Sequence, residues 1–254
     1  MNFTFALLKA IHKFLIDTCH ENFKSINIGK VNLMEVIIMK ELLEANDKLA
    51  EENRKYFTDR HILAVNLMGS PGAGKTTFIS AIAKELQDIR VGVVEGDIAS
   101  SIDADHLEKQ GIHSAQINTC GECHLDAHVI RNGVDQIDMR NAIVFIENVG
   151  NLICPAEFDL GESVRLLAAS VPEGDDKPFK YVPMFSYIDA VVLTKYDLKE
   201  AVGFDSENFL KGLRAVSQAP VFEVSLKKGT AGTGIAAVAD YLRKKYNEMG
   251  TMNK

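Results

Sequence analysis

A glycine-rich stretch, GSPGAGKTT at residues 69–77, constrains the fold of this chain more than any other feature. It matches the phosphate-binding pattern G-x-x-x-x-G-K-[ST], follows the apolar run ILAVNLM and opens the helical pattern TTFISAIAKEL. The pattern has a physical meaning only between a strand and a helix. There the glycines let successive N–H groups point inward at phosphate oxygens, and the helix N-terminus adds partial positive charge. The sequence therefore predicts a nucleotide-phosphate site.

The rest of the chain alternates short apolar runs with helical patterns, as expected for an α/β fold. Continuous rather than alternating apolar runs indicate parallel strands that are covered on both faces. We expect a mainly parallel sheet of the P-loop NTPase class with helices on both faces. The expected strands are 61–69, 91–97, 113–119, 142–150, 190–195 and 220–226. The expected helices between and after them are 76–87, 100–110, 123–134, 207–216 and 235–248.

The N-terminal part of the chain divides at about residue 30. Apolar residues recur near a period of 3.6 between residues 31 and 56, which predicts a helix packed on the edge of the domain. Residues 31–254 should therefore form one domain that begins with this helix. Residues 1–30 form an extension, helical or flexible, whose apolar run is too short and too interrupted by charge to span a membrane.

Composition excludes several classes of protein. The net charge is −7 and no basic stripe is present, so the chain is a poor candidate for binding nucleic acid. Four cysteines are too few for a disulfide scaffold of 254 residues. Free thiols favour a reducing compartment. We expect a cytoplasmic protein that binds neither nucleic acid nor a membrane.

The glycine-rich loop and two acidic strand ends form the expected phosphate site. Lys75 should reach the β and γ phosphates, and the Thr76 hydroxyl should bind Mg²⁺. Asp97 and Glu147 end two of the expected strands, where either could hold Mg²⁺, orient the attacking water or cap the next helix. The expected nucleotide-binding loop consists of Gly69, Ser70, Pro71, Gly72, Ala73, Gly74, Lys75, Thr76 and Thr77.

The sequence TKYD at 194–197 resembles the [NT]-K-x-D element that reads guanine. Asp197 can accept hydrogen bonds from the two donors on the Watson–Crick edge of guanine, and the Lys195 stem can lie along the base. Thr194 replaces the usual Asn, which should loosen the loop more than it alters the choice of base. The stretch SLKKGTAG at 225–232 is placed to supply backbone donors to the base. GTP is therefore the expected nucleotide.

The stretch INTCGECHLDAH at 117–128 concentrates two cysteines and two histidines. Cys120 and Cys123 form a C-x-x-C, but no second pair follows at zinc-finger spacing, and a thioredoxin-like redox pair needs a different context. The motif follows the third expected strand, and Cys154 follows the fourth. Because the carboxyl ends of parallel strands share one rim, Cys123, His124 and Cys154 should converge.

Three such soft ligands would leave one position of a metal shell for water or a second chain. Either nickel or zinc could be bound by these cysteine and histidine ligands. His128 lies four residues after His124, on one face of the expected helix, either as an ordinary surface residue or as an extra ligand. Cys120 is left as structural or spare.

Four strings together resemble the HypB family, GTPases that help insert nickel into [NiFe]-hydrogenases: GSPGAGKTT, EGDIASSIDADHL, TCGECHLDAHVI and ENVGNLICPAEFDLGE. The likeness runs from about Val31 to the C-terminus. It implies GTP hydrolysis with Mg²⁺ and nickel or zinc on Cys123, His124 and Cys154. It also implies a GTP-dependent homodimer that works with other hydrogenase-maturation proteins and the hydrogenase large subunit.

Hydrolysis should be slow without a partner, because no finger-like arginine is identifiable. Met1–Lys30 offers only Cys19 and His20 as metal ligands, and the seven histidines are scattered, which argues against nickel storage. Three alternatives remain: a related chaperone GTPase serving urease, a metal-binding protein with a weakly active P-loop, and a kinase-like ATPase. The loop from Glu147 to Cys154 carries expected residues of both the nucleotide site and the metal site, and it could couple the two.

Overall fold

The computed structural model describes residues 33–97, 107, 111–119, 123–226 and 233–251. The chain separates into two units, residues 1–42 and residues 43–254, with the boundary inside the first described helix. The second unit contains the sheet and both expected sites. The extension at residues 1–30 and most of the helix expected at 100–110 lie outside the described residues.

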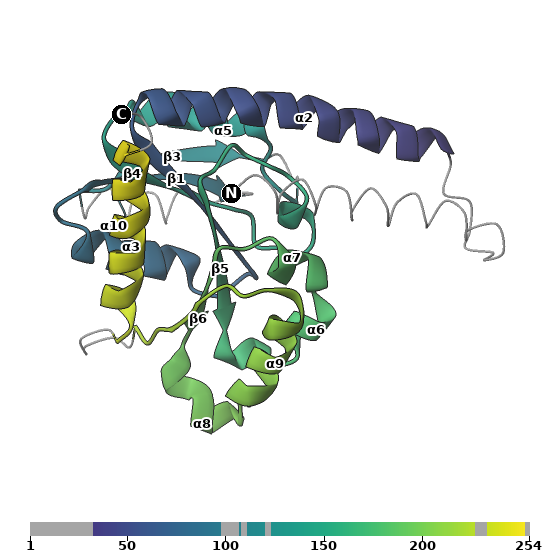
Figure 1. Ribbon diagram of the computed structural model, residues 1–254, viewed down its shortest axis with the longest axis vertical. Coiled ribbons are helices and arrows are strands. Elements are labelled where there is room, and N and C mark those ends of the chain that lie inside the picture. Colours follow the sequence, from purple (N-terminus) through teal and green to yellow (C-terminus); the bar gives the residue numbers. More distant parts are fainter. Residues whose placement is uncertain (1–32, 98–106, 108–110, 120–122, 227–232, 252–254) are drawn as a thin grey trace. The chain divides into compact units, whose positions relative to one another are not determined.

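A seven-stranded sheet forms the centre of the second unit, in the order β3-β2-β4-β1-β5-β6-β7 (Figure 1). Every neighbouring pair is parallel, which confirms the expected α/β class. The strands are β1 (Ile62–Gly69), β2 (Arg90–Asp97), β3 (His113–Asn118), β4 (Ala142–Glu147), β5 (Val164–Ser170), β6 (Ala190–Thr194) and β7 (Val221–Glu223).

The described helices include several short turns between the later strands. They are α2 (Leu33–Asp59), α3 (Lys75–Glu85), α5 (Ala127–Ile137), η2 (Cys154–Ala156), η3 (Val171–Glu173), α6 (Lys177–Lys180), α7 (Val182–Ser186), η4 (Tyr196–Leu198), α8 (Lys199–Val202), α9 (Ser206–Val216) and α10 (Ile235–Thr251). Within the described residues, none of them combines the length and the apolar content needed to cross a membrane.

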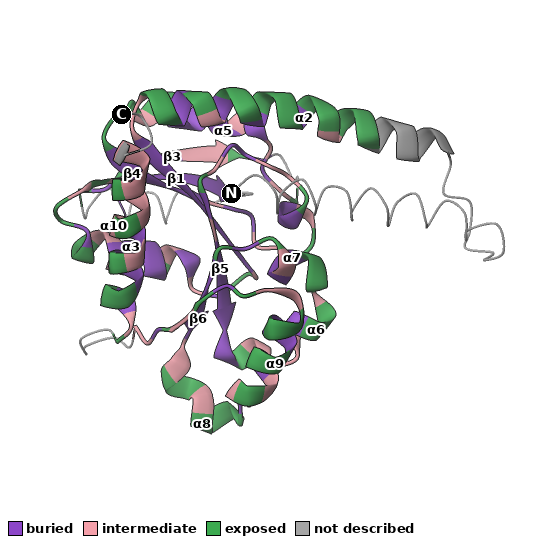
Figure 2. Cartoon of the chain, in the orientation of Figure 1, coloured by how far each residue is buried: buried purple, intermediate pink, exposed green. Residues whose placement is uncertain are grey.

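Side chains of β1 alternate between two hydrophobic cores, as the period of two in a strand requires. Leu63, Val65 and Leu67 pack into the core beneath α3 and α10. Ile62 and Ala64 pack into the core beneath α5 and the end of α2. A third core lies between β5, β6, α7 and α9. Burial on both faces explains the continuous apolar runs, and Figure 2 shows that most residues of the central strands are buried.

Strand β5 was not expected from the sequence. Its residues, VRLLAAS, are rich in leucine and alanine, which favour helices at least as well as strands, and no helical pattern separates it from β4. The strand lies between β1 and β6. It packs closely against the start of the glycine-rich loop, because a Cβ at Gly69 would lie 2.4 Å from the carbonyl oxygen of Ala168.

The helix expected at 123–134 begins four residues later, at Ala127. The Asp126 carboxylate accepts a hydrogen bond from the Val129 N–H and caps the helix at that point. His124 therefore precedes α5, and the expectation that it shares a helix face with His128 was wrong. His128 itself is exposed on the first turn of α5.

Candidate nucleotide and metal site

The glycine-rich loop joins β1 to α3, as the sequence predicts. Gly72 and Gly74 have φ angles of 75° and 90°, in the left-handed region that a side chain strongly disfavours. The Ala73 N–H donates to the Ser70 carbonyl at 3.1 Å, and α3 begins at Lys75. The loop therefore turns sharply into a helix N-terminus, which is the arrangement that binds phosphate groups.

Lys75 is 8% exposed and lies inside this loop. Its ammonium group donates to the carbonyls of Gly69 and Ser70, at 3.3 and 3.4 Å. A lysine folded over the loop in this way has its positive charge where the β and γ phosphates of a bound nucleotide would lie. Thr77, the last residue of the motif, is exposed.

Glu147, the last residue of β4, meets the start of α3. Its carboxylate accepts a hydrogen bond from the Thr76 hydroxyl at 2.9 Å. The contact arises because β4 pairs directly with β1, which places the ends of both strands side by side. A hydroxyl and a carboxylate are oxygen donors of the kind that Mg²⁺ prefers. Asp97 ends the neighbouring strand β2, and its side chain lies outside the described part.

The TKYD element begins at the end of β6. The Thr194 hydroxyl is buried and donates to the Ala73 carbonyl at 2.6 Å, and the Lys195 ammonium donates to the Gly72 carbonyl at 2.7 Å. Both bonds tie this element to the glycine-rich loop, which opposes the loosening expected from Thr194. Asp197 lies exposed in η4. Most of SLKKGTAG lies outside the described residues, although Ser225 and Thr233 pair across its ends.

Two cysteines that are 31 residues apart in sequence come together beyond β3 and β4. The Cys123 and Cys154 sulfur atoms are 3.1 Å apart, and His124 Nδ1 lies 3.6 Å from the Cys123 sulfur. The His124 ring also stacks on Phe158, with ring centroids 3.8 Å apart. The expected meeting of the two loops is therefore confirmed. Cys123 is exposed and Cys154 is half-buried.

The thiol pair does not amount to a complete metal site. Among the residues that the structure describes, no three His, Cys, Asp or Glu side chains are arranged so that they could hold a metal ion. Cys120 lies outside these residues. The role of Cys123, His124 and Cys154 as ligands therefore stays a prediction.

Asparagines around the thiol loops were missed by the sequence reasoning. Asn46 of α2 donates to the Asp159 carbonyl at 2.8 Å and accepts from the Ala127 N–H at 2.9 Å. Asn53 of the same helix donates to the carbonyls of Ala127 and Leu160. Both side chains are buried, so they fix the segments that follow each cysteine. No local signal marks them, because the apolar period that predicts this helix includes Leu42 and Leu49, which are exposed, rather than the face that Asn46 and Asn53 share.

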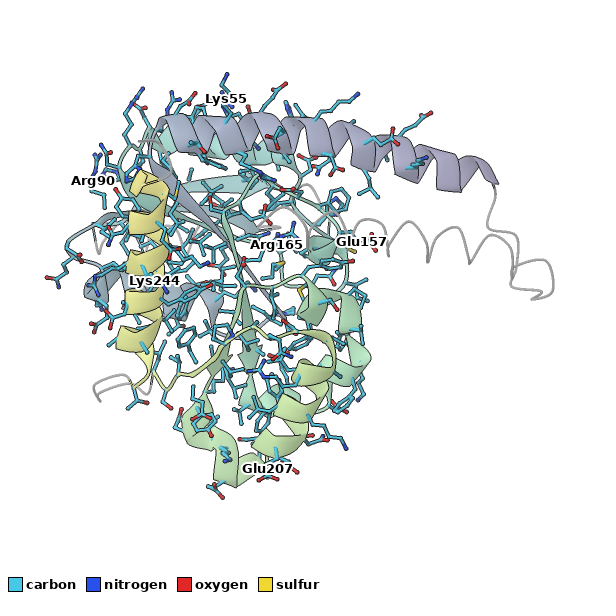
Figure 3. All side chains as sticks on the ribbon, in the orientation of Figure 1. Lys55, Arg90, Glu157, Arg165, Glu207 and Lys244 are labelled. Atoms are coloured by element: carbon cyan, nitrogen blue, oxygen red, sulfur yellow. The ribbon has the colours of Figure 1, made fainter. Side chains whose placement is uncertain are left out.

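Charges beside these segments complete the attachment of α2. Arg54 and Asp159 form an ion pair at 2.8 Å. Burial raises the pKa of the Asp159 carboxyl, but the positive charges of Arg54 and Arg165 and a hydrogen bond from the Gly161 N–H outweigh burial and hold that pKa below its usual value. Arg165, labelled in Figure 3, also pairs with Glu162 at 2.5 Å. The segment after Cys154 is therefore held by ion pairs from two sides.

Known proteins are similar to this chain in sequence and in fold. Residues 63–223 match the profile of the CobW/HypB/UreG nucleotide-binding domain. The hydrogenase maturation factor HypB of Escherichia coli (strain K12) is 41% identical over 205 residues, which cover 80% of this chain and 69% of that protein. The hydrogenase/urease maturation factor HypB of Helicobacter pylori (strain ATCC 700392 / 26695) is 37% identical over 207 residues, which cover 79% and 85%.

A solved structure agrees with these sequence comparisons. The crystal structure of HypB from Helicobacter pylori in complex with nickel matches with a TM-score of 0.76 at 35% identity. The match covers 80% of this chain and 96% of that one. Sequence and fold thus point to the same relatives. The chain therefore belongs to the CobW/HypB/UreG family of nucleotide-binding proteins, and within it to HypB.

Proposed function

We propose that this chain is a GTPase that delivers nickel during maturation of a [NiFe]-hydrogenase. The observation that carries the proposal is the meeting of the Cys123 and Cys154 thiols, 3.1 Å apart, beside a phosphate-binding loop. The relatives named above are hydrogenase maturation factors, and one of them was crystallised with nickel. The chain would act in a reducing cytosol, where its thiols stay free.

The phosphate site handles GTP by positioning and charge. Backbone N–H groups of the loop and the Lys75 ammonium hold the β and γ phosphates in line for attack by water. The Thr76 hydroxyl and the Glu147 carboxylate, already in contact, would hold Mg²⁺, with Asp97 as a further candidate. When bound, Mg²⁺ neutralises charge that develops on the phosphate oxygens. We expect slow intrinsic turnover, because a charge-stabilising arginine must come from a partner.

Guanine selection rests on the TKYD element. The Asp197 carboxylate would accept from the two donors on the base edge, which adenine does not present, and the Lys195 stem would lie along the ring. The bonds from Thr194 and Lys195 to the glycine-rich loop support this assignment, because they fix the base-reading loop relative to the phosphates. Competition of ATP against labelled GTP tests it. Equal binding of the two would favour a kinase-like ATPase.

Nickel would be the ion carried by Cys123, His124 and Cys154. Cys123, His124 and Cys154 would supply three soft ligands, and water or a second chain would supply the fourth. Zinc suits the same ligands. We propose a GTP-dependent homodimer in which the Cys123, His124 and Cys154 residues of the two chains meet. When hydrolysis separates the two chains, nickel would pass to the hydrogenase large subunit or to another maturation protein.

Nickel and zinc titrations of the wild type and of Cys123→Ala, each with and without a non-hydrolysable GTP analogue, test the metal site. The variant should lose one metal equivalent per chain and keep its affinity for nucleotide. Cys19→Ala is the matched control, because that thiol lies in residues 1–30, and it should bind the same number of ions as the wild type. Unchanged stoichiometry in Cys123→Ala would contradict the site.

Urease is a second recipient to consider, because the Helicobacter pylori relative carries both names. The two roles are separated by expressing the chain in cells that lack their own HypB and measuring both enzymes. Restored hydrogenase activity with unchanged urease activity supports the first role. Restored urease activity adds the second.

A further inference from the structure

We propose that Asn148 and Asn151 are positioning residues that transmit the state of the phosphate site to the thiol pair. The proposal rests on the nickel-carrying GTPase function proposed above and assigns its coupling to particular side chains. Both asparagines lie in the segment that follows β4, between Glu147 and Cys154. This segment touches the glycine-rich loop along one side and the Cys123 loop along the other.

Three contacts join the segment to the glycine-rich loop. Glu147 accepts from the Thr76 hydroxyl at 2.9 Å. Gly150 packs so closely on Pro71 that an added Cβ would lie 2.8 Å from the proline Cγ. The backbone of Asn151 pairs with Gly69 in an isolated antiparallel bridge. If phosphate binding moves the glycine-rich loop, this segment must therefore move with it.

The two asparagine side chains join the same segment to the backbone around the first thiol. Asn151 Nδ2 donates to the Cys123 carbonyl at 3.3 Å, while its Oδ1 accepts from the Ile153 N–H at 2.9 Å. Asn148 Oδ1 accepts from the Leu125 N–H at 3.4 Å. The backbone on both sides of His124 is thus held from the segment that ends in the second thiol. Neither bond joins the cysteine side chains themselves, so both can act without occupying the metal.

A buried chain of hydrogen bonds fixes the orientation of Asn148. The Glu162 carboxylate accepts from Asn66 Nδ2 at 3.2 Å, so the Asn66 oxygen must face the other way. That oxygen accepts from Asn148 Nδ2, also at 3.2 Å, which turns the Asn148 oxygen toward Leu125. Asn148 and Asn66 are 1% and 0% exposed. The Asn148 amide donates and accepts at once, and a fully satisfied buried network of this kind holds its members in one arrangement.

In this geometry a single displacement of the segment acts on both thiols. Displacement of Glu147, Gly150 or Asn151 by a bound phosphate shifts the Cys123 backbone through the asparagines and shifts Cys154 through the chain itself. Because the sulfurs are in direct contact, unequal shifts change their separation and hence the affinity for nickel. Coupling between two ligands is reciprocal, so nickel should change GTP affinity by the same factor.

The test measures nickel affinity with and without a non-hydrolysable GTP analogue, following thiolate-to-nickel absorption, in Asn148→Ala and Asn151→Ala. For the wild type we expect a ratio in the range of roughly 5- to 150-fold that is typical of coupled sites. In both variants the ratio should fall below about twofold, on that same scale. One nickel should still bind per chain, and GTP should still bind without metal. Asn151→Ala keeps the test decisive where the buried Asn148→Ala fails to fold.

Asn53→Ala is the matched control. It removes a buried asparagine that holds the backbone at Ala127, close to the thiol loop, but from α2 rather than from the segment after β4. Its ratio should equal that of the wild type. A wild-type ratio in Asn151→Ala, or an equal loss in Asn53→Ala, would overturn the assignment. Nickel binding to the wild type with a ratio of one would remove the coupling alone, whereas unchanged nickel binding in Cys123→Ala would remove the proposed function.

Discussion

The phosphate loop and the thiol pair both follow the carboxyl ends of parallel strands, yet they are built in different ways. The loop is nine consecutive residues whose binding groups are largely backbone, shaped by glycines at positive φ. The thiol pair joins residues 31 positions apart, and asparagine side chains hold it in place. A contiguous backbone site can be recognised from local sequence, whereas a converged side-chain site depends on every segment that positions it.

Among these substitutions, loss of Lys75 should have the largest effect, and it should leave the Cys123–Cys154 pair unchanged. Lys75→Ala removes the buried ammonium, so GTP hydrolysis should fall by about 100-fold or more, as for loss of other charge-stabilising groups. Nickel affinity without nucleotide should not change. Lys84→Ala, an exposed lysine on the same helix, is the control in both assays. A role in the cell that survives Lys75→Ala would instead indicate a vestigial P-loop.

Gly150→Ala should affect both sides, because this residue lies on the segment they share. The added methyl group would meet Pro71 at 2.8 Å, an overlap that costs up to about 3 kcal/mol and displaces the glycine-rich loop or the segment after β4. GTP and nickel affinities should both fall when measured by titration. Gly250→Ala, whose added methyl would make only an ordinary contact with His61, should change neither. An effect on one ligand alone would show that the two sites are separable here.

Thr194→Val should affect only the nucleotide side. Valine keeps the shape but leaves the Ala73 carbonyl without its buried donor, at a cost of about 1–2 kcal/mol in the free energy of unfolding in urea. GTP affinity should fall, and nickel affinity without nucleotide should hold. Thr194→Ser retains the hydroxyl and should recover most of the loss.

Asp159→Asn should have the smallest effect: the variant should be slightly less stable than the wild type above about pH 4, and the two should converge in acid. The folded pKa of Asp159 is lowered, so its contribution to stability is present above the unfolded pKa of about 4 and is lost as pH falls through the folded value. Wild-type stability should therefore decline more steeply below about pH 4 than that of the variant. Asp47→Asn, at an exposed position of α2, the helix that carries Arg54, should follow the wild-type curve.

The same contrast explains how much the sequence could predict. The glycine-rich loop, its strand and its helix are local, so their pattern located them, and the parallel order of strands then placed Cys154 near Cys123. Strand β5 escaped because leucine and alanine do not distinguish a buried strand from a helix. The start of α5 was set by the Asp126 side chain, which outweighed the helical pattern before it.

The asparagines were harder to predict, because their partners lie far away in sequence. Asn66 interrupts the apolar run of β1, and a polar residue at a buried strand position signals a buried hydrogen bond. The polar residue alone does not identify the group to which it is hydrogen-bonded. The bond from Asn148 crosses 82 residues, and the bond from Asn66 to Glu162 crosses 96. Such pairs follow from the tertiary structure alone.

The open position of Cys123 has a consequence for how a cargo ion leaves. A cation enclosed in a cage must shed its donors before a new one can approach, so its exchange is slow. At an open mouth, an incoming thiolate or imidazole can attach first, and the original donors depart one at a time. Because Cys123 is exposed while Cys154 is half-buried, the outer sulfur would be the point of entry in the proposed carrier, and release would proceed as a relay without unfolding it.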